Sequence, residues 1–283
     1  MMASPMSRCR SALFLPASNA RAIVKARGLP CDAVVLDLED SVAPEAKAAA
    51  RDAARAALHD GGFGPRLLVV RINAVDGEWA EDDLAALATA PPDAVLLPKV
   101  DGVATLRMAR ERLGPNGPAV WAMIETARGI MALPEIASAA AELRLGALVA
   151  GTNDLALDLR CRPGPDRAPL LPALAQIVAA ARAGRMLALD GVLNVFDDPD
   201  RLAAECRQGA DWGFDGKSLI HPAQIDAANA AFGPTEAEVG RARAIVAAFA
   251  SPGTEGRGAI RLNGEMVERL HLMEAERVLA LVE

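Results

Sequence analysis

Two carboxylate residues in the middle of the chain each come directly after a short apolar run. Glu125 follows VWAMI, and Asp154 ends the segment LVAGTND. If the two runs are neighbouring parallel strands, both carboxylates face one mouth at the strands' carboxyl ends. Magnesium is commonly held by one or two carboxylates while water and substrate oxygens complete its shell, so the pair predicts a magnesium site. The alternatives are a helix cap or a pair with Arg128 for Glu125, and a loop cap for Asp154.

A second group of acids follows another apolar run, in the segment LDLEDSVAPEAK. Asp37, Glu39 and Asp40 fall within four residues of one another. Strand alternation would place Asp37 and Glu39 on one face if the strand continues that far. Two interpretations are open. The acids form a second metal site, or they position Lys47 and order water, with Asp40 or Ser41 capping the next helix.

Three cationic positions and one histidine also follow apolar runs. Arg71, in VVRINA, could clamp a carboxylate or stabilise an enolate, or it could form a buried salt bridge with the acids of LDLED. Lys99, in LLPKV, stands where a Schiff-base lysine would, but nearby acids keep such an amine protonated and argue against imine chemistry. Lys217 and His221, in GFDGKSLIHP, come at the last strand, where barrels often bind phosphate-bearing ligands; a purely structural histidine is the alternative.

The elements that must position these groups alternate along the chain. Strands are predicted near residues 11–15, 33–38, 67–72, 94–98, 119–124, 146–150, 188–193 and 214–219. Alanine-rich stretches suited to helices lie between them, at residues 44–58, 81–90, 103–113, 133–143 and 198–210. This order predicts an α/β fold, a closed parallel (β/α)8 TIM barrel. The rival is a doubly wound sheet, but no glycine-rich dinucleotide fingerprint follows the first strand, where the chain reads FLPASNARAIVKA.

The chain continues beyond the barrel. We expect a barrel domain over residues 1–232 and a C-terminal helical extension over 233–283. In the extension, GPTEAEVGRARAIVAAFA predicts a helix, the next stretch is glycine-rich and mobile, and LHLMEAERVLALVE predicts a last helix. Such an extension can cover its own active-site mouth or that of a neighbouring subunit.

Composition narrows the classes of partner. The 283 residues carry a formal net charge of −7 without blocks of like charge, so a nucleic-acid partner is not expected. The four cysteines are scattered and predict reduced thiols without a zinc site. The N-terminal apolar stretch ALFL is far shorter than the ~20 residues that span a membrane. We therefore expect a cytoplasmic protein with a small-molecule substrate and no membrane partner.

Taken together, the motifs carry a resemblance to a known family. RSALFLPASNARAIVKA, VVLDLEDSVAPEAKAAAR, LVVRINAVDGEW, VLLPKV, WAMIETARGI, GTNDL, DGVLNVFDD and GFDGKSLIHPAQIDAANAAF occur in this order over roughly residues 10–232. The set resembles the citrate lyase β-subunit-like CoA-ester lyases of the HpcH/HpaI aldolase superfamily. The resemblance implies a magnesium-dependent (β/α)8 barrel, assembled as a homotrimer or hexamer. It also implies cleavage or formation of the C–C bond of a 3-hydroxy-3-carboxyalkyl-CoA thioester.

The resemblance assigns roles to individual residues. Glu125 and Asp154 match the magnesium ligands, and Arg71 matches the substrate-binding arginine. Further positions match contacts with the CoA ester or stand beside a metal ligand: Phe14, Lys25, Asn153, Ile220 and His221.

The chain departs from the family pattern at two positions. Asn19 stands where some malyl-CoA lyases carry a phosphate-binding arginine, so the CoA contact is expected to be shared differently, with Arg21 as a candidate. In NGEMVERLHL, Glu268 replaces the acidic residue that related chains supply across a subunit boundary from a GKMVD-like sequence. An acid or base role for Glu268 is therefore an expectation.

These observations predict an enzyme that acts on malyl-CoA-like thioesters. The expected reaction is C–C cleavage to a 2-oxo acid, such as glyoxylate or pyruvate, and an acyl-CoA. Two alternatives remain: hydrolysis to malate and CoA, as in the (3S)-malyl-CoA thioesterase branch that the motifs resemble most, and a citrate-lyase-β-like subunit acting on an acyl carrier. The expected catalytic set is Arg71, Glu125, Asp154, Glu268, Asp37, Glu39, Asp40 and Lys47.

Overall fold

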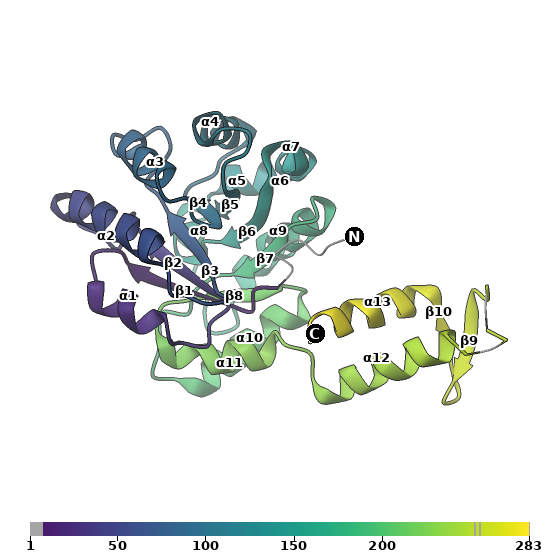
Figure 1. Ribbon diagram of the computed structural model, residues 1–283. Helices are drawn as coiled ribbons and strands as arrows, with labels where there is room; N and C mark the ends of the chain where they lie inside the picture. The colour runs from purple at the N-terminus through teal and green to yellow at the C-terminus, as the bar shows by residue number, and fades with distance from the viewer. Residues whose placement is uncertain (1–7, 252, 255, 283) are drawn as a thin grey trace. The chain divides into compact units, whose positions relative to one another are not determined.

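The computed structural model describes residues 8–251, 253–254 and 256–282, and the chain divides into two compact units between Phe232 and Gly233 (Figure 1). Each unit has its own hydrophobic core. Among the described residues, no helix is long and apolar enough to cross a membrane. Cys9, Cys31, Cys161 and Cys206 are all free thiols, as predicted.

The first unit contains a closed barrel of eight parallel strands within the described part of the chain (Figure 1). The strands follow one another around the barrel in chain order, and β1 closes it by pairing with β8. This confirms the predicted (β/α)8 barrel. The strands are β1 (Ser11–Pro16), β2 (Ala33–Asp37), β3 (Leu67–Arg71), β4 (Ala94–Leu97), β5 (Ala119–Ile124), β6 (Leu145–Ala150), β7 (Leu187–Asp190) and β8 (Gly216–Leu219).

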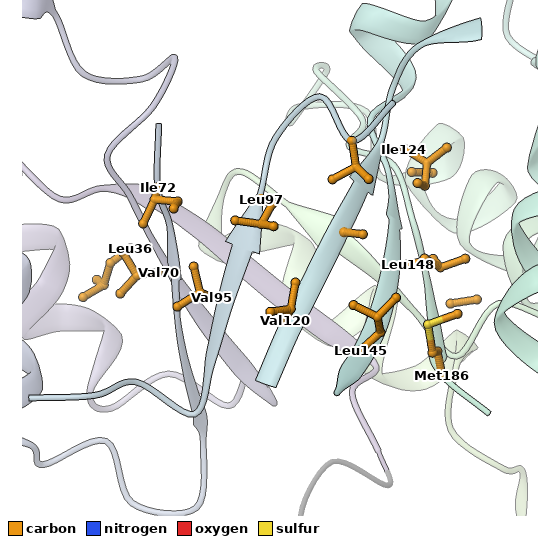
Figure 2. Packing of buried hydrophobic residues seen from close by; sticks show 14 of the residues in the cluster. Leu36, Val70, Ile72, Val95, Leu97, Val120, Ile124, Leu145, Leu148 and Met186 are labelled. Carbon is orange, nitrogen blue, oxygen red and sulfur yellow. The ribbon is translucent and has the colours of Figure 1, made fainter. Parts of the chain in front are cut away.

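Alternate residues of each strand build two different layers. Inward-facing side chains such as Val35, Val69 and Trp121 form one buried cluster inside the barrel. Their sequence neighbours, such as Leu36 and Val70, belong to a larger cluster between strands and helices, part of which Figure 2 shows. Because both faces are buried, the strands are continuous apolar runs. Whether a residue faces the interior or the helices therefore follows from its parity along the strand.

Helices cover the outside of this barrel (Figure 1). They are α1 (Ala20–Ala26), α2 (Lys47–Asp60), α3 (Ala80–Ala88), α4 (Val103–Leu113), α5 (Ala127–Met131), α6 (Leu133–Ser138), α7 (Ala140–Leu143), α8 (Thr152–Asp158), α9 (Leu171–Ala183), α10 (Pro199–Asp211) and α11 (Ile225–Ala231). Short 3₁₀ turns are η1 (Pro44–Ala46), η2 (Ala168–Leu170) and η3 (Pro222–Gln224). The single helix expected over 133–143 is divided at Ala139, whose φ of −87° and ψ of −1° depart from helical values.

The second unit pairs two helices with a β-hairpin. It comprises α12 (Glu236–Phe249), β9 (Ala259–Leu262), β10 (Glu265–Glu268) and α13 (Arg269–Ala280). Both helices were expected, but the glycine-rich stretch between them contains an antiparallel hairpin that was not. Its turn is Asn263–Gly264, with φ of 51° and 89°. An Asn-Gly pair adopts positive φ at both positions easily and favours tight hairpin turns, so the signal was present in the sequence.

Candidate active site

The carboxyl ends of the barrel strands surround a cavity of about 480 Å³. Its wall contains Arg71 from β3, Glu125 after β5 and Asp154 from α8. Phe14 of β1 and Ile220, directly after β8, also line it. The expectation that strand-end groups meet at one mouth is therefore met for Arg71, Glu125 and Asp154.

Glu125 is buried at the edge of the cavity, with only 4% of its surface exposed. Its Oε1 accepts a hydrogen bond of 2.6 Å from the backbone N–H of Lys99. The cap of α5 is instead Thr126, whose Oγ1 accepts from Gly129 N–H, so Glu125 is not the helix cap. Burial raises the pKa of Glu125 to about 7, and the negative charge of Asp154 adds to this rise. The site thus concentrates negative charge that a bound cation would neutralise.

A glycine couples the two carboxylate positions. A Cβ on Gly151 would lie 2.4 Å from Glu125 Oε2, so this position requires glycine for close packing. Gly151 N–H donates to Ile124 O at 3.0 Å, which joins the ends of β5 and β6. Gly151 also precedes α8, and Asp154 lies in the first turn of that helix. The short segment from 151 to 154 therefore fixes Asp154 relative to Glu125.

Arg71 lies between the cavity and two of the acids predicted to accompany it. Its Nε and Nη2 donate to the two oxygens of Asp37, each at 2.6 Å, and its Nη1 lies 2.9 Å from Glu39 Oε2. Nη1 also donates to Met123 Sδ at 3.9 Å, so four of the five N–H donors of the guanidinium have partners. Arg71 thus forms the buried salt bridge and also lines the cavity, where its role toward a substrate stays a prediction.

The pKa values of the two acids in this cluster shift in opposite directions. Burial raises the pKa of Asp37, but hydrogen bonding and the charge of Arg71 outweigh burial and hold it below its ordinary value. Burial raises the pKa of Glu39, and the charge of Arg71 only partly offsets it. Asp37 is therefore the fixed anion of the pair.

Lys47 is buried beneath the acidic segment rather than in the cavity wall. Its Nζ donates to Leu38 O and Glu39 O, both at 2.8 Å, and to Asn73 Oδ1 at 2.7 Å. These contacts use all three ammonium donors. Lys47 thus holds the backbone that presents Glu39, whereas we expected the acids to position the lysine.

The predicted helix cap in this segment is wrong. The residue that precedes η1 is Ala43, and no side chain caps that turn. Asp40 is exposed and lines the cavity, and Ser41 N–H donates to Asp37 Oδ2 at 3.3 Å. The acid that organises the turn is thus Asp37, which also accepts from Glu39 N–H at 2.9 Å. A carboxylate already at the strand end makes a separate cap unnecessary.

Lys99 follows β4 in a left-handed conformation, with φ of 49°. Its Nζ lies 3.6 Å from Glu39 Oε1 and its side chain is half exposed. Burial lowers the pKa of Lys99, but the charges of Glu39, Asp40 and other nearby carboxylates outweigh burial and raise it. A protonated amine is a poor nucleophile, which agrees with the expectation that this lysine forms no imine.

The residues matched to the CoA ester are not all in one place. The Arg71 guanidinium lies 5.6 Å from the centre of the Phe14 ring, inside the cavity. Asn153 lies in the cavity wall and exchanges side-chain hydrogen bonds with Asn194, at 3.2 and 2.9 Å. His221 is exposed and stacks on Phe196, with ring centres 5.2 Å apart.

Two further predicted contacts lie on α1. Asn19 caps this helix, because its Oδ1 accepts from Ala22 N–H at 3.0 Å. Lys25 is an exposed residue in the last turn. The described wall of the cavity includes neither residue. The departure from the family pattern at position 19 thus has a local reason, since asparagine is a good N-cap and arginine is not.

Lys217 does not face the cavity, contrary to its suggested role with a phosphate. It is fully buried between β8 and α10, with Nζ 3.2 Å from Asp190 Oδ2 and 2.7 Å from Glu205 Oε1. Arg167 completes the cluster by donating to both oxygens of Asp190, at 2.8 and 2.9 Å. Sequence reasoning missed this network. The signal available was Asp190 at the end of the run LALD.

Glu268 belongs to the second unit. It ends β10 and directly precedes α13, and its N–H donates to His271 Nδ1 at 2.9 Å. Its side chain is partly buried within that unit. The acid or base role expected for Glu268 stays a prediction.

Comparison with known proteins places the chain among relatives. A family model described as HpcH/HpaI aldolase/citrate lyase matches residues 10–222. The chain is 44% identical over 274 residues to a (3S)-malyl-CoA thioesterase of Cereibacter sphaeroides (strain ATCC 17025 / ATH 2.4.3), covering 97% of this chain and 94% of that protein. It is 36% identical over 283 residues to citrate lyase subunit beta of Escherichia coli (strain K12), covering 97% and 93%.

A solved structure extends the comparison to ligands. Protein CitE from Mycobacterium tuberculosis, solved in complex with magnesium, acetoacetate and coenzyme A, is 33% identical to this chain with a TM-score of 0.77. The match covers 97% of this chain and 98% of that one.

Proposed function

The chain is an enzyme that belongs to the HpcH/HpaI aldolase/citrate lyase family, and we propose that it cleaves malyl-CoA-like 3-hydroxy-3-carboxyalkyl-CoA thioesters with the help of magnesium. The products would be a 2-oxo acid, such as glyoxylate or pyruvate, and an acyl-CoA. The observation that supports this most is the cavity wall, where two carboxylates and a guanidinium come from separate strand ends.

The residues present fit magnesium. Glu125 and Asp154 offer hard oxygen donors in one wall, and the described residues contain no cluster of three or more His, Cys, Asp or Glu side chains that would suit a softer or closed metal site. Two protein ligands leave positions for water and substrate oxygens. When bound, magnesium supplies a Lewis acid that lowers the pKa of the substrate hydroxyl.

Arg71 would serve the other end of the reacting group. Asp37 and Glu39 hold its guanidinium in place, and with the weak bond to Met123 Sδ one N–H donor is left for a ligand. In cleavage, a water in the cavity would take the proton of the substrate hydroxyl, and the hydroxyl carbon would become the carbonyl of the 2-oxo acid. The electrons of the broken C–C bond would pass to the thioester, which becomes an enolate. A fixed guanidinium stabilises that negative charge because it needs no reorganisation. Glu268, or water ordered by Asp40 and its neighbours, would return a proton to carbon.

Hydrolysis of the thioester is the second candidate. The (3S)-malyl-CoA thioesterase at 44% identity favours it. In this reaction Glu125 and Asp154 would hold the substrate as before, and a base-activated water would attack the thioester carbonyl. The C–S bond then breaks, with malate and CoA as products. The same cavity can serve both reactions, since they differ in the position of one water and in the base that activates it.

One assay separates these reactions. Purified protein is incubated with (3S)-malyl-CoA and magnesium, and the products are quantified. Glyoxylate with acetyl-CoA supports the lyase, whereas malate with free CoA supports the thioesterase. A third possibility is a citrate-lyase-β-like subunit, supported by relatives of that name. In that case no CoA ester would turn over, and an acyl carrier protein would co-purify with the chain.

We also propose a cytoplasmic homo-oligomer, a trimer or hexamer, in which Glu268 acts in its own subunit or across an interface. The resemblance to the family supports this assembly. Light scattering on the purified protein measures the mass directly. If Glu268 acts across an interface, mixing inactive Glu125→Ala and Glu268→Ala subunits would restore part of the activity.

A further inference from the structure

Ser218 lies in the wall of the cavity, beside the residues of the proposed function. It is the third residue of β8, between Lys217 and Leu219. Lys217 binds Glu205 of α10, and Leu219 belongs to the core between strands and helices, so both point outward. By strand alternation Ser218 points into the barrel.

The hydroxyl of Ser218 is buried without a partner. Only 1% of the residue is exposed, and Oγ makes no hydrogen bond to any residue that the structure describes. The neighbouring strand offers a contrast, since Ser11 Oγ donates to Asn229 Oδ1 at 2.8 Å. A buried hydroxyl without a partner destabilises a fold, and alanine would fill nearly the same space without that cost. The unpaired hydroxyl of Ser218 therefore indicates a hydrogen bond to a ligand atom.

The neighbours of Ser218 indicate which part of the ligand that is. Ile220, two residues further along, also lines the cavity, and so does Phe14 of the adjacent strand β1. The carboxylates of the proposed metal site come instead from the ends of β5 and β6. In the order of strands around the barrel, β8 is thus separated from the metal-binding side. A CoA ester would be held on the metal-binding side by its hydroxy acid end, and its CoA chain would leave past Phe14 and Ile220. Its thioester carbonyl would then lie next to Ser218.

We propose that Ser218 is a substrate-binding residue whose Oγ donates a hydrogen bond to the thioester carbonyl oxygen of the bound CoA ester. The inference rests on the proposed function, because that function supplies the thioester. It holds for both reactions, since the carbonyl oxygen gains negative charge in an enolate and also when water attacks. A donor placed before the reaction strengthens its bond to that oxygen as the charge develops.

The test compares two ligands that differ by one acyl group. Calorimetry with acetyl-CoA and with CoA is run on the wild type and on Ser218→Ala. We expect the variant to bind acetyl-CoA about two- to tenfold more weakly, as for one lost hydrogen bond, and to bind CoA unchanged. The melting temperature should not fall, because no protein partner is lost. Ser11→Ala is the matched control, in which the melting temperature should fall because Asn229 Oδ1 loses its donor and Asp32 N–H loses an acceptor.

Each other outcome has a defined meaning. Equal weakening of both ligands, no weakening of acetyl-CoA, or a lowered melting temperature for Ser218→Ala would overturn the inference and leave the proposed function intact. A wild type that binds neither ligand would overturn both. If Ser218→Ala does not fold, Ser218→Cys keeps the side-chain volume with a much weaker donor, and the same pattern is expected.

Discussion

Two buried ion clusters of the barrel unit look alike in composition but differ in what they can do. The first joins Arg71 to Asp37 and Glu39, and the second joins Arg167 and Lys217 to Asp190 and Glu205. Asp37 and Asp190 are each the last residue of a strand. They differ in parity, because Asp37 continues the inward series of Val35 while the residue before Asp190, Leu189, is the one that faces inward.

The comparison shows that a strand-end position alone does not make a catalytic residue. Asp37 and Arg71 of the inward cluster line the cavity, and the guanidinium keeps one N–H donor for a ligand. In the outward cluster, Lys217 and Asp190 have no exposed surface, and Lys217 donates to Asp190, Glu205 and Gly191 O. The first cluster is suited to chemistry and the second to fixing α10 against β7 and β8. Four predictions test this division.

Removing the charge of Lys217 should have the largest effect, and on stability. Lys217→Met leaves Asp190 and Glu205 with one cationic partner, Arg167. Loss of one partner from a buried cluster costs about 3–5 kcal/mol in free energy of unfolding. Chemical denaturation measures the loss, and kcat of the folded fraction should stay within about threefold of the wild type. A strong loss of kcat with unchanged stability would contradict the division.

Glu125→Gln should have the opposite profile. The amide keeps the volume but removes a metal-binding charge, so activity should fall on the order of 10³-fold. Stability should hold or rise, because burial makes the charged form of Glu125 costly and raises its pKa to about 7. Steady-state kinetics and thermal melting are measured on the same preparation. If the variant melts well below the wild type while keeping its activity, Glu125 is a structural residue.

Arg71→Lys should reduce kcat/KM by about 10²-fold with a smaller loss of stability. Lysine keeps the positive charge, but its single ammonium nitrogen cannot reproduce the planar two-pronged bond to Asp37 while also reaching Glu39 and a ligand. The comparison is made with Arg167→Lys, which should change stability more than kcat/KM. Similar kinetic losses in the two variants would remove the distinction between the clusters.

Acid should destabilise the protein through both clusters. The loss of unfolding free energy should be smaller than in the variants above and confined to a narrow pH range. Charges of Lys217 and Arg167 outweigh burial and hold the pKa of Asp190 below its ordinary value, as Arg71 does for Asp37. Their stabilising contribution is complete above the unfolded pKa of ~3.9 and is lost as pH falls through the folded pKa. The free energy of unfolding, followed from pH 6 down, should fall below about pH 4. In Lys217→Met the fall should be smaller, because a higher folded pKa of Asp190 lies nearer the unfolded pKa and less proton uptake accompanies unfolding; an equally large fall would show that Lys217 does not lower the pKa of Asp190.

The sequence could predict the barrel because its signal is repeated. Most strands are continuous apolar runs, and α4 has the predicted bounds, Val103–Leu113. Glu125 and Asp154 could also be predicted as site residues, since each closely follows the apolar run of a strand. The inward-facing residues of β8 could not be predicted, because this strand reads GKSL and is too polar to reveal which face is inward.

Other features depend on contacts distant in sequence. Arg167 lies outside any strand or helix, with its own φ at 57°, and its side chain contacts Asp190. No local sequence pattern predicts that contact. The cap of the turn after β2 was predicted wrongly because we gave Asp37 roles toward a metal, Lys47 or Arg71, and none toward the backbone. In the structure it also accepts two backbone N–H groups, the role we gave to Asp40 or Ser41. The hairpin of the second unit could have been predicted from Asn263–Gly264 alone.

The absence of a side chain at Gly151 affects how much conformational entropy the site loses when a ligand binds. Because backbone lies directly against the carboxylate of Glu125, and Gly151 O accepts from Leu155 N–H at 3.0 Å, the end of β6 and the start of α8 form one short rigid link. The spacing of the two carboxylates is then set during folding. A cation or substrate that arrives finds the site preorganised, and little conformational freedom is left to lose on binding.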